Sequence, residues 1–316
     1  MIEKYYDGAI EQVAAGLGTV EKNHLLVRYS GQFSVENLND TKQLEKNEDI
    51  FVQVHEFETG EITCAYEPYL TMICDGFRRY MTGTFEEFME TCDVYYLHRP
   101  VLLGYFNQDN TGREEIILLD EVAYEQERML AALERMLCAI ADRHPVLFVL
   151  NRFQLASKST MQLTARFLKC ENCNIGLVLG VSDIQAMPEF LVPDWEMLYE
   201  TLDDGSKIYH IGNSGRKKEE TIDDEKYVDY GSEKVYRKLQ NMVEFLDFDQ
   251  AAYYLETIER KIKFDNLLVD DAARFRMWLL FVKVSILRQD IPKALEICED
   301  LEKIHLAGKE EECAYE

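Results

Sequence analysis

Hydrophobic positions in the first two thirds of the chain switch between helical spacing and short continuous runs. Residues 2–16 and 121–143 carry apolar side chains at helical intervals, which predicts two amphipathic helices. Four segments are short apolar runs of the kind that form buried strands: residues 24–30, 49–58, 146–150 and 174–182. Strands that alternate with helices in this way predict an α/β domain with a parallel sheet.

The segments between these runs complete the pattern. Residues 69–81 and 157–169 are predicted to be helices, the second with Ser157 or Ser159 as its N-cap. Residues 99–106 and 114–120 are short and apolar, and we expect them to be extended.

The pattern changes near residue 214, where a charged stretch rich in turn formers begins. Beyond it, every apolar pattern is helical. The motif Asp-x-x-x-Ala starts at Asp247 and again at Asp290, 43 residues later, and each copy opens an apolar helix. We therefore expect a first domain over residues 1–215, a charged linker over 216–233 and an all-α region of helical hairpins over 234–316.

Composition and charge exclude several classes of protein. The 316 residues include 59 acidic and 34 basic side chains, for a formal net charge of −25, which would repel nucleic acid and anionic membranes. No apolar run reaches the roughly 20 residues of a membrane helix, and no signal peptide is visible. We expect a cytoplasmic protein that contacts neither nucleic acid nor membrane.

The cysteines and histidines offer little chemistry. Cys170 and Cys173 form a single CxxC, without the second pair that a zinc site would need, so we expect neither a metal nor a redox role. No two histidines have metal-binding helical spacing. His24 and His144 each flank a predicted strand, where an exposed turn is expected.

The second predicted hairpin resembles the tetratricopeptide repeat. That family places Trp early in the first helix, a small residue sixteen positions later and an apolar residue four beyond, and Trp278, Ala294 and Cys298 occupy these positions. Val282 departs from the pattern, because the family prefers Gly or Ala there. The first hairpin matches through Ala251 and Leu255.

The order of elements over residues 5–215 resembles the ATPase domain of the STAND class of signal-transduction ATPases, which has an AAA-like, P-loop NTPase fold. A helix and a strand precede the P-loop position, a segment with Pro68-Tyr69 follows, and a long helix leads to a strand, a helix opened by Ser and a sensor strand. The resemblance implies a bacterial regulator with helical repeats.

The chemistry of that class is missing. A P-loop reads GxxxxGK[ST], because its glycines wrap phosphates, its Lys neutralises them and its hydroxyl holds magnesium. In this alignment Arg28 replaces the first Gly and Phe33 the last, Ser34 replaces the Lys and Val35 the Ser/Thr, while Gly31 is retained.

The second acidic motif is also absent. The class ends this strand with two acidic residues that hold magnesium and polarise water. Here the strand is followed by Asn151 and Arg152, and the sensor strand ends at Ser182-Asp183 in place of Thr/Ser and Arg. We therefore expect a pseudo-ATPase that is not an enzyme, with no cofactor, no metal and no catalytic residues.

Three functions follow from this interpretation. The first is a non-catalytic signalling module whose helical repeats bind a protein or peptide. The second is a nucleotide-responsive STAND ATPase that controls transcription or another output, and the third is a small-molecule sensor that uses the cleft beside Gly31. Residues 309–316 resemble the start of another helix, so we also expect the chain to be part of a longer protein with more hairpins.

Overall fold

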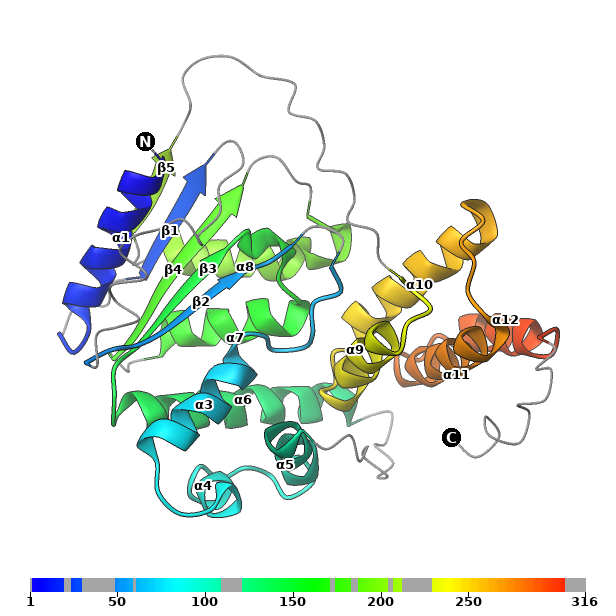
Figure 1. Cartoon of the computed structure of the whole chain (residues 1–316), viewed down its shortest axis with the longest axis horizontal. Helices are drawn as coiled ribbons and strands as arrows, with labels where there is room; N and C mark the ends of the chain where they lie inside the picture. Colours follow the sequence, from blue (N-terminus) through cyan, green and yellow to red (C-terminus); the bar gives the residue numbers. More distant parts are fainter. Residues whose placement is uncertain are drawn as a thin grey trace. The chain divides into compact units, whose positions relative to one another are not determined.

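The computed structural model of the chain describes residues 2–19, 24–29, 49–58, 61–108, 121–170, 174–182, 187–203, 207–211 and 229–304 (Figure 1). The chain divides into two compact units. Residues 1–108 and 129–226 form the first, called here the sheet unit, and residues 109–128 and 227–316 form the second, called the helical unit. Most of the predicted linker lies outside the described residues.

The sheet unit is built on a parallel sheet of five strands in the order β2-β3-β4-β1-β5. The strands are β1 (His24–Tyr29), β2 (Phe51–Glu56), β3 (Val146–Asn151), β4 (Ile175–Ser182) and β5 (Lys207–Ile211). The predicted parallel sheet is confirmed, and β5 was not predicted. Because all strands run the same way, their last residues meet at one edge, called here the carboxyl edge.

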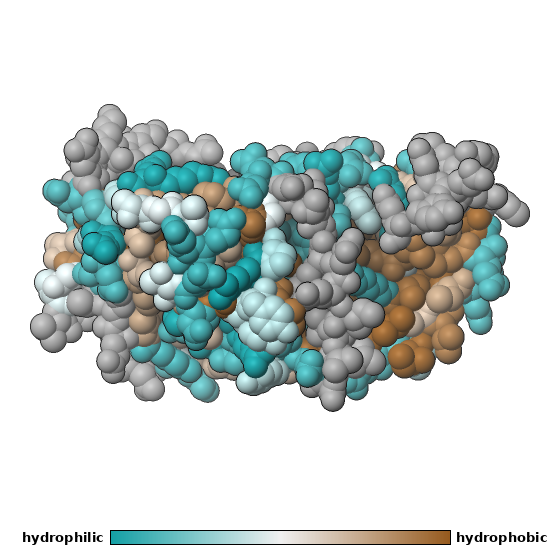
Figure 2. Space-filling view, turned by 90° about the horizontal axis from the view of Figure 1, so that it is seen from below, coloured by the Kyte–Doolittle hydropathy of each residue, from teal (hydrophilic) through white to brown (hydrophobic). Residues whose placement is uncertain are grey.

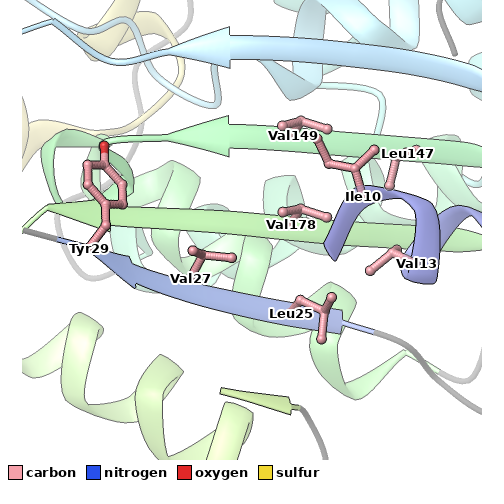
Figure 3. Packing of buried hydrophobic residues seen from close by; sticks show 8 residues of the cluster. All are labelled: Ile10, Val13, Leu25, Val27, Tyr29, Leu147, Val149 and Val178. Carbon is pink, nitrogen blue, oxygen red and sulfur yellow. The ribbon is translucent and has the colours of Figure 1, made fainter. Parts of the chain in front are cut away.

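Helix α1 (Ile2–Gly16) covers one face of this sheet. Its Ile10 and Val13 pack against alternate residues of β1, β3 and β4 (Figure 3). Gly176 of β4 allows this approach, because a Cβ there would lie 2.6 Å from a Val13 methyl group. After α1 the chain turns at Gly18, whose φ of +76° suits glycine.

On the other face of the sheet, α3 (Tyr69–Tyr80) packs against β3 and against α7 (Lys158–Lys169). Gly76 of α3 lies beside Ile140 of α6 (Val122–Ala141). The buried ring of Tyr69 lies 4.7 Å from that of Phe148 in β3 and 5.1 Å from that of Phe167 in α7, measured between centroids. Ser157 is the N-cap of α7 and accepts a hydrogen bond from the Thr160 amide, as predicted.

The expectation that residues 99–106 are extended was wrong, and one short helix was missed. Residues 99–106 are helical, in α5 (Arg99–Asn107), where Pro100 sits in the first turn and its fixed φ favours the helix. Helix α4 (Phe85–Thr91) was not expected, although Thr84 and Glu87 close a capping box at its start. Residues 114–120 lie outside the described residues.

Helix α8 (Val192–Asp203) completes the described helices of the sheet unit, with short 3-10 turns at Phe153–Leu155 and Glu189–Leu191. The two histidines expected in exposed turns are not exposed. His24 begins β1 and is buried, and His144 is half-buried with its ring stacked on Tyr80 at 4.2 Å between centroids.

The described part of the helical unit downstream of residue 228 contains two hairpins. Helices α9 (Glu233–Glu244) and α10 (Phe248–Phe264) form the first hairpin, and α11 (Asp271–Leu287) and α12 (Ile291–Leu301) form the second. Trp278 of α11 is 1% exposed, and the small residues Ala251 and Ala294 are buried.

The two hairpins turn in the same way. Leu246 and Gln289 have φ of 65° and 61°, in the left-handed region, and lie 43 residues apart. The next amides, of Asp247 and Asp290, donate to the carbonyls five residues earlier at 2.7 and 2.8 Å. This is the Schellman ending of a helix, so the repeat inferred from the sequence is also a repeat of backbone geometry.

Candidate functional site

The carboxyl edge of the sheet is the place where parallel α/β folds bind ligands, because helix and loop connections diverge there. The predicted site residue Asn151 is the last residue of β3, and Arg152 follows it. Tyr29 ends β1 and Glu56 ends β2, where it lies opposite Asn151 in the strand register. The structure therefore gathers these four side chains at one edge.

Tyr29 and Asn151 form the buried centre of this edge. The Tyr29 hydroxyl donates to Asn151 Oδ1 at 2.7 Å, and Asn151 is 0% exposed. Figure 3 shows the Tyr29 ring at the end of β1, on the same face as Leu25 and Val27. Burial raises the pKa of Tyr29 to about 12, against the opposing effects of the Arg152 charge and the Asn151 hydrogen bond. The hydroxyl thus remains a neutral donor at physiological pH.

Arg152 forms an ion pair with Glu56 at the same edge of the sheet. Its backbone is left-handed, with φ of 52°, and its Nε lies 3.4 Å from Glu56 Oε1. Both side chains are 18% exposed, so solvent reaches this ion pair only in part. Glu56 is an acidic residue at the carboxyl edge, and its charge is balanced by Arg152.

Gln154 forms two hydrogen bonds with the backbone at the end of β4. Gln154 Nε2 donates to the Ser182 carbonyl at 3.2 Å, and the Ser182 amide donates to Gln154 Oε1 at 3.3 Å. Ser182, at the predicted sensor position, is therefore bonded through its backbone to the turn after β3. Asp183 lies outside the described residues.

The predicted P-loop positions are described only at their start. Arg28 and Tyr29 belong to β1, so the strand continues through the first two positions of the aligned motif. Arg28 is half-buried, and its guanidinium lies 5.5 Å from the ring centroid of Tyr199 in α8. Gly31, Phe33, Ser34 and Val35 lie outside the described residues.

This arrangement does not fit the magnesium ion that accompanies a nucleotide in P-loop enzymes. Magnesium is held by carboxylates and hydroxyl or water oxygens. At this edge the amide of Asn151 is already bonded to Tyr29, and the carboxylate of Glu56 is paired with a cation. Within the described ranges, no group of three or more His, Cys, Asp or Glu side chains could hold a metal ion.

The structure describes only one of the two cysteines of the CxxC motif. Cys170 is half-buried at the end of α7, and its Sγ lies 3.4 Å from that of Cys138 in α6, while Cys173 lies outside the described residues. No helix in the described parts of the chain is long and apolar enough to cross a membrane.

Sequence reasoning identified Asn151 and Arg152 but missed Tyr29, Glu56 and Gln154. Tyr29 and Glu56 each end a strand, and the carboxyl ends of parallel strands meet at one edge of the sheet. Alternation along β1 also places Tyr29 on the same face as Leu25 and Val27, which was a usable signal.

Comparison with known proteins adds no family to this description. No model of a protein family matches the chain, and no curated protein matches it in sequence.

Proposed function

We propose that this chain is a non-catalytic regulatory module, in which the sheet unit is a pseudo-ATPase and the helical unit binds a protein or peptide. The observation that carries the proposal is the hydrogen bond between Tyr29 and Asn151 at the carboxyl edge. It occupies, with neutral groups, the position where a P-loop ATPase needs a carboxylate for its metal ion. The Arg152–Glu56 ion pair supports the same conclusion, because it neutralises a neighbouring carboxylate.

Two features support the role of the helical unit. It contains two hairpins that repeat with the same turn geometry, and stacked hairpins of this kind offer extended surfaces to partners. The strongly acidic charge of the chain favours a partner with basic groups over a nucleic acid.

Isothermal titration calorimetry of the whole chain with ATP, with and without magnesium, tests the pseudo-ATPase. We expect no saturable binding in either condition. Micromolar binding that requires magnesium would overturn the proposal and favour a nucleotide-responsive regulator. Titration with ATP and EDTA serves as the matched control, because it separates metal-dependent binding from attraction to surface lysines and arginines.

A further inference from the structure

One stripe of α10 faces the second hairpin. Ala252, Leu255, Glu256 and Glu259 follow the spacing of a single helix face and form what we call the α10 stripe. Ala252, Leu255 and Glu259 are buried.

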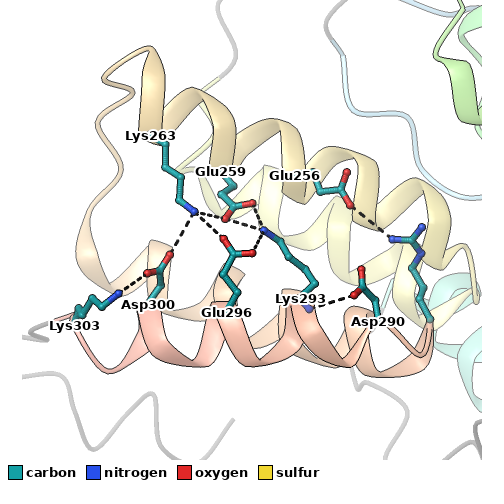
Figure 4. A network of polar contacts seen from close by, with 9 residues as sticks. Glu256, Glu259, Lys263, Asp290, Lys293, Glu296, Asp300 and Lys303 are labelled. Carbon is teal, nitrogen blue, oxygen red and sulfur yellow. Dashed lines mark hydrogen bonds and ion pairs between the residues drawn. The ribbon is translucent and has the colours of Figure 1, made fainter.

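Salt bridges show what this stripe faces. Glu259 Oε2 lies 2.8 Å from Lys293 Nζ of α12, and Glu256 Oε1 lies 3.7 Å from Nη1 of Arg288 at the end of α11 (Figure 4). The α10 stripe therefore combines two apolar residues and two glutamates, and its glutamates meet basic residues that flank the turn of the next hairpin.

The second hairpin carries the same stripe 43 residues later. Leu295, Cys298, Glu299 and Glu302 occupy the equivalent positions, and we call them the α12 stripe. The chemistry is preserved position by position, with two apolar residues followed by two glutamates. The burial is not preserved, because all four residues of the α12 stripe are exposed. Leu295 is 61% exposed, whereas its counterpart Ala252 is 1% exposed.

The α12 stripe has an exposed apolar neighbour and two glutamates without an ion pair in the described ranges. Ile291, one turn before Leu295, is 48% exposed, while its counterpart Phe248 is buried. Figure 2 shows hydrophobic surface gathered over α11 and α12. Within the described ranges, the carboxylates of Glu299 and Glu302 have no ion pair, in contrast to those of Glu256 and Glu259.

We infer that the α12 stripe binds a helical hairpin of a partner protein, which brings an apolar face and basic residues beside its turn. Arg288 and Lys293 show on this molecule how such residues meet the equivalent glutamates. The inference rests on the proposed function, because it names the site and the chemistry of the protein partner.

Charge decides against two other occupants. Residues 305–316 contain four glutamates and one lysine, so they do not supply the basic residues that the stripe requires. A second copy of the chain brings its own net charge of −25, and its Arg288 and Lys293 are already engaged with its own α10.

A synthetic peptide with the sequence of residues 271–304 is the probe, because this segment contains Arg288 and Lys293, which pair with the glutamates of the α10 stripe. It has equal numbers of acidic and basic residues, so diffuse attraction to the acidic chain is weak. Fluorescence anisotropy of the labelled peptide with the full chain should give saturable, salt-sensitive binding, and the peptide can fold as it binds.

Variants of the chain and of the peptide locate the contact. Leu295→Ser, and separately Glu299→Lys with Glu302→Lys, should each weaken binding by about tenfold or more. Glu196→Lys with Glu200→Lys on α8 is the matched control, with the same change of charge on exposed residues, and should leave binding unchanged. A peptide with Arg288→Glu and Lys293→Glu should lose binding to the natural chain and regain it with the Glu299→Lys, Glu302→Lys chain.

The outcomes separate the two proposals. Absence of saturable binding, or binding that the stripe variants leave unchanged, would overturn this inference alone. Magnesium-dependent binding of ATP would overturn the pseudo-ATPase and leave the peptide result standing. Sedimentation that shows a dimer, lost in the Leu295→Ser chain, would make a second copy the occupant and contradict the partner inferred here.

Discussion

At the scale of single residues, the carboxyl edge depends on the hydroxyl of Tyr29. It is the donor that satisfies Asn151 Oδ1, and both residues are buried. Tyr29→Phe keeps the ring and removes the donor, which leaves a buried amide oxygen without this partner. We expect the sheet unit to lose about 1–3 kcal/mol of its free energy of unfolding.

Fluorescence can measure this loss in one unit at a time. The chain has two tryptophans, Trp195 in the sheet unit and Trp278 in the helical unit. In a Trp278→Phe background, urea unfolding followed by Trp195 reports the sheet unit. Tyr96→Phe, the same change at a residue that is 62% exposed, is the control and should change stability by less than about 0.5 kcal/mol. Equal stability of the Tyr29→Phe and parent chains would show that the bond does not stabilise the edge.

At the scale of elements, ion pairs join α10 to α12. Lys263 Nζ of α10 lies 3.2 Å from Glu296 Oε1 of α12, and Lys293 Nζ of α12 lies 2.8 Å from Glu259 Oε2 of α10 (Figure 4). Within α12, Lys293 Nζ also lies 3.0 Å from Glu296 Oε2. The hydrogen bonds from Lys293 and Lys263 hold the pKa of Glu296 below its usual value. A carboxylate with a lowered pKa in the folded state contributes stability above its unfolded pKa, and that contribution is lost as the pH falls through the folded pKa.

Acid should therefore weaken the helical unit. We expect its melting temperature, followed by Trp278 fluorescence in a Trp195→Phe background, to fall as the pH is lowered from neutral to below the ordinary pKa of glutamate, about 4.3. Glu296→Gln should lower the melting temperature at neutral pH and reduce its dependence on acid. Glu299→Gln, on the same helix but without an ion pair in the described structure, is the control. A pH profile unaltered by Glu296→Gln would contradict the assignment.

The elements also show how far a sequence predicts this fold. Strands β1 to β4 and the long helices other than α8 were predicted because their apolar periods are strong and continuous. Helix α8 was not predicted. The seven-residue helix α4 was missed because tertiary packing supports it: Phe85 stacks on Phe106 of α5 at 4.1 Å between centroids. Strand β5 has five residues and depends on pairing with β1, which no local pattern encodes.

The candidate site was predictable only in part for a related reason. Asn151 and Arg152 follow a strand and could be placed at its end from the sequence alone. The partner of Asn151 is Tyr29, 122 residues earlier, and the two strands are separated in the sheet by β4. That contact depends on strand order, which a single sequence does not supply.

At the scale of the whole molecule, the proposed pseudo-ATPase should not gain activity through repair of the P-loop motif alone. Phe33→Gly, Ser34→Lys and Val35→Thr together restore the end of a P-loop motif. We expect no phosphate release from ATP above that of buffer, because Asn151 still supplies no charge for magnesium. The parent chain is the matched control, and release is followed with a coupled colorimetric assay.

Adding Asn151→Asp to that triple variant should still fail. The new carboxylate would be buried and would accept a hydrogen bond from the Tyr29 hydroxyl. It would also lie beside the Arg152 cation, which competes with a metal ion for the carboxylate. We expect magnesium-dependent turnover to require Arg152→Glu as well, because that change removes the competing cation and frees Glu56. Turnover in the triple variant alone would show that the metal ion is held by groups other than residue 151, with Glu56 the first to test by Glu56→Gln, and the carboxyl edge would then be an active site.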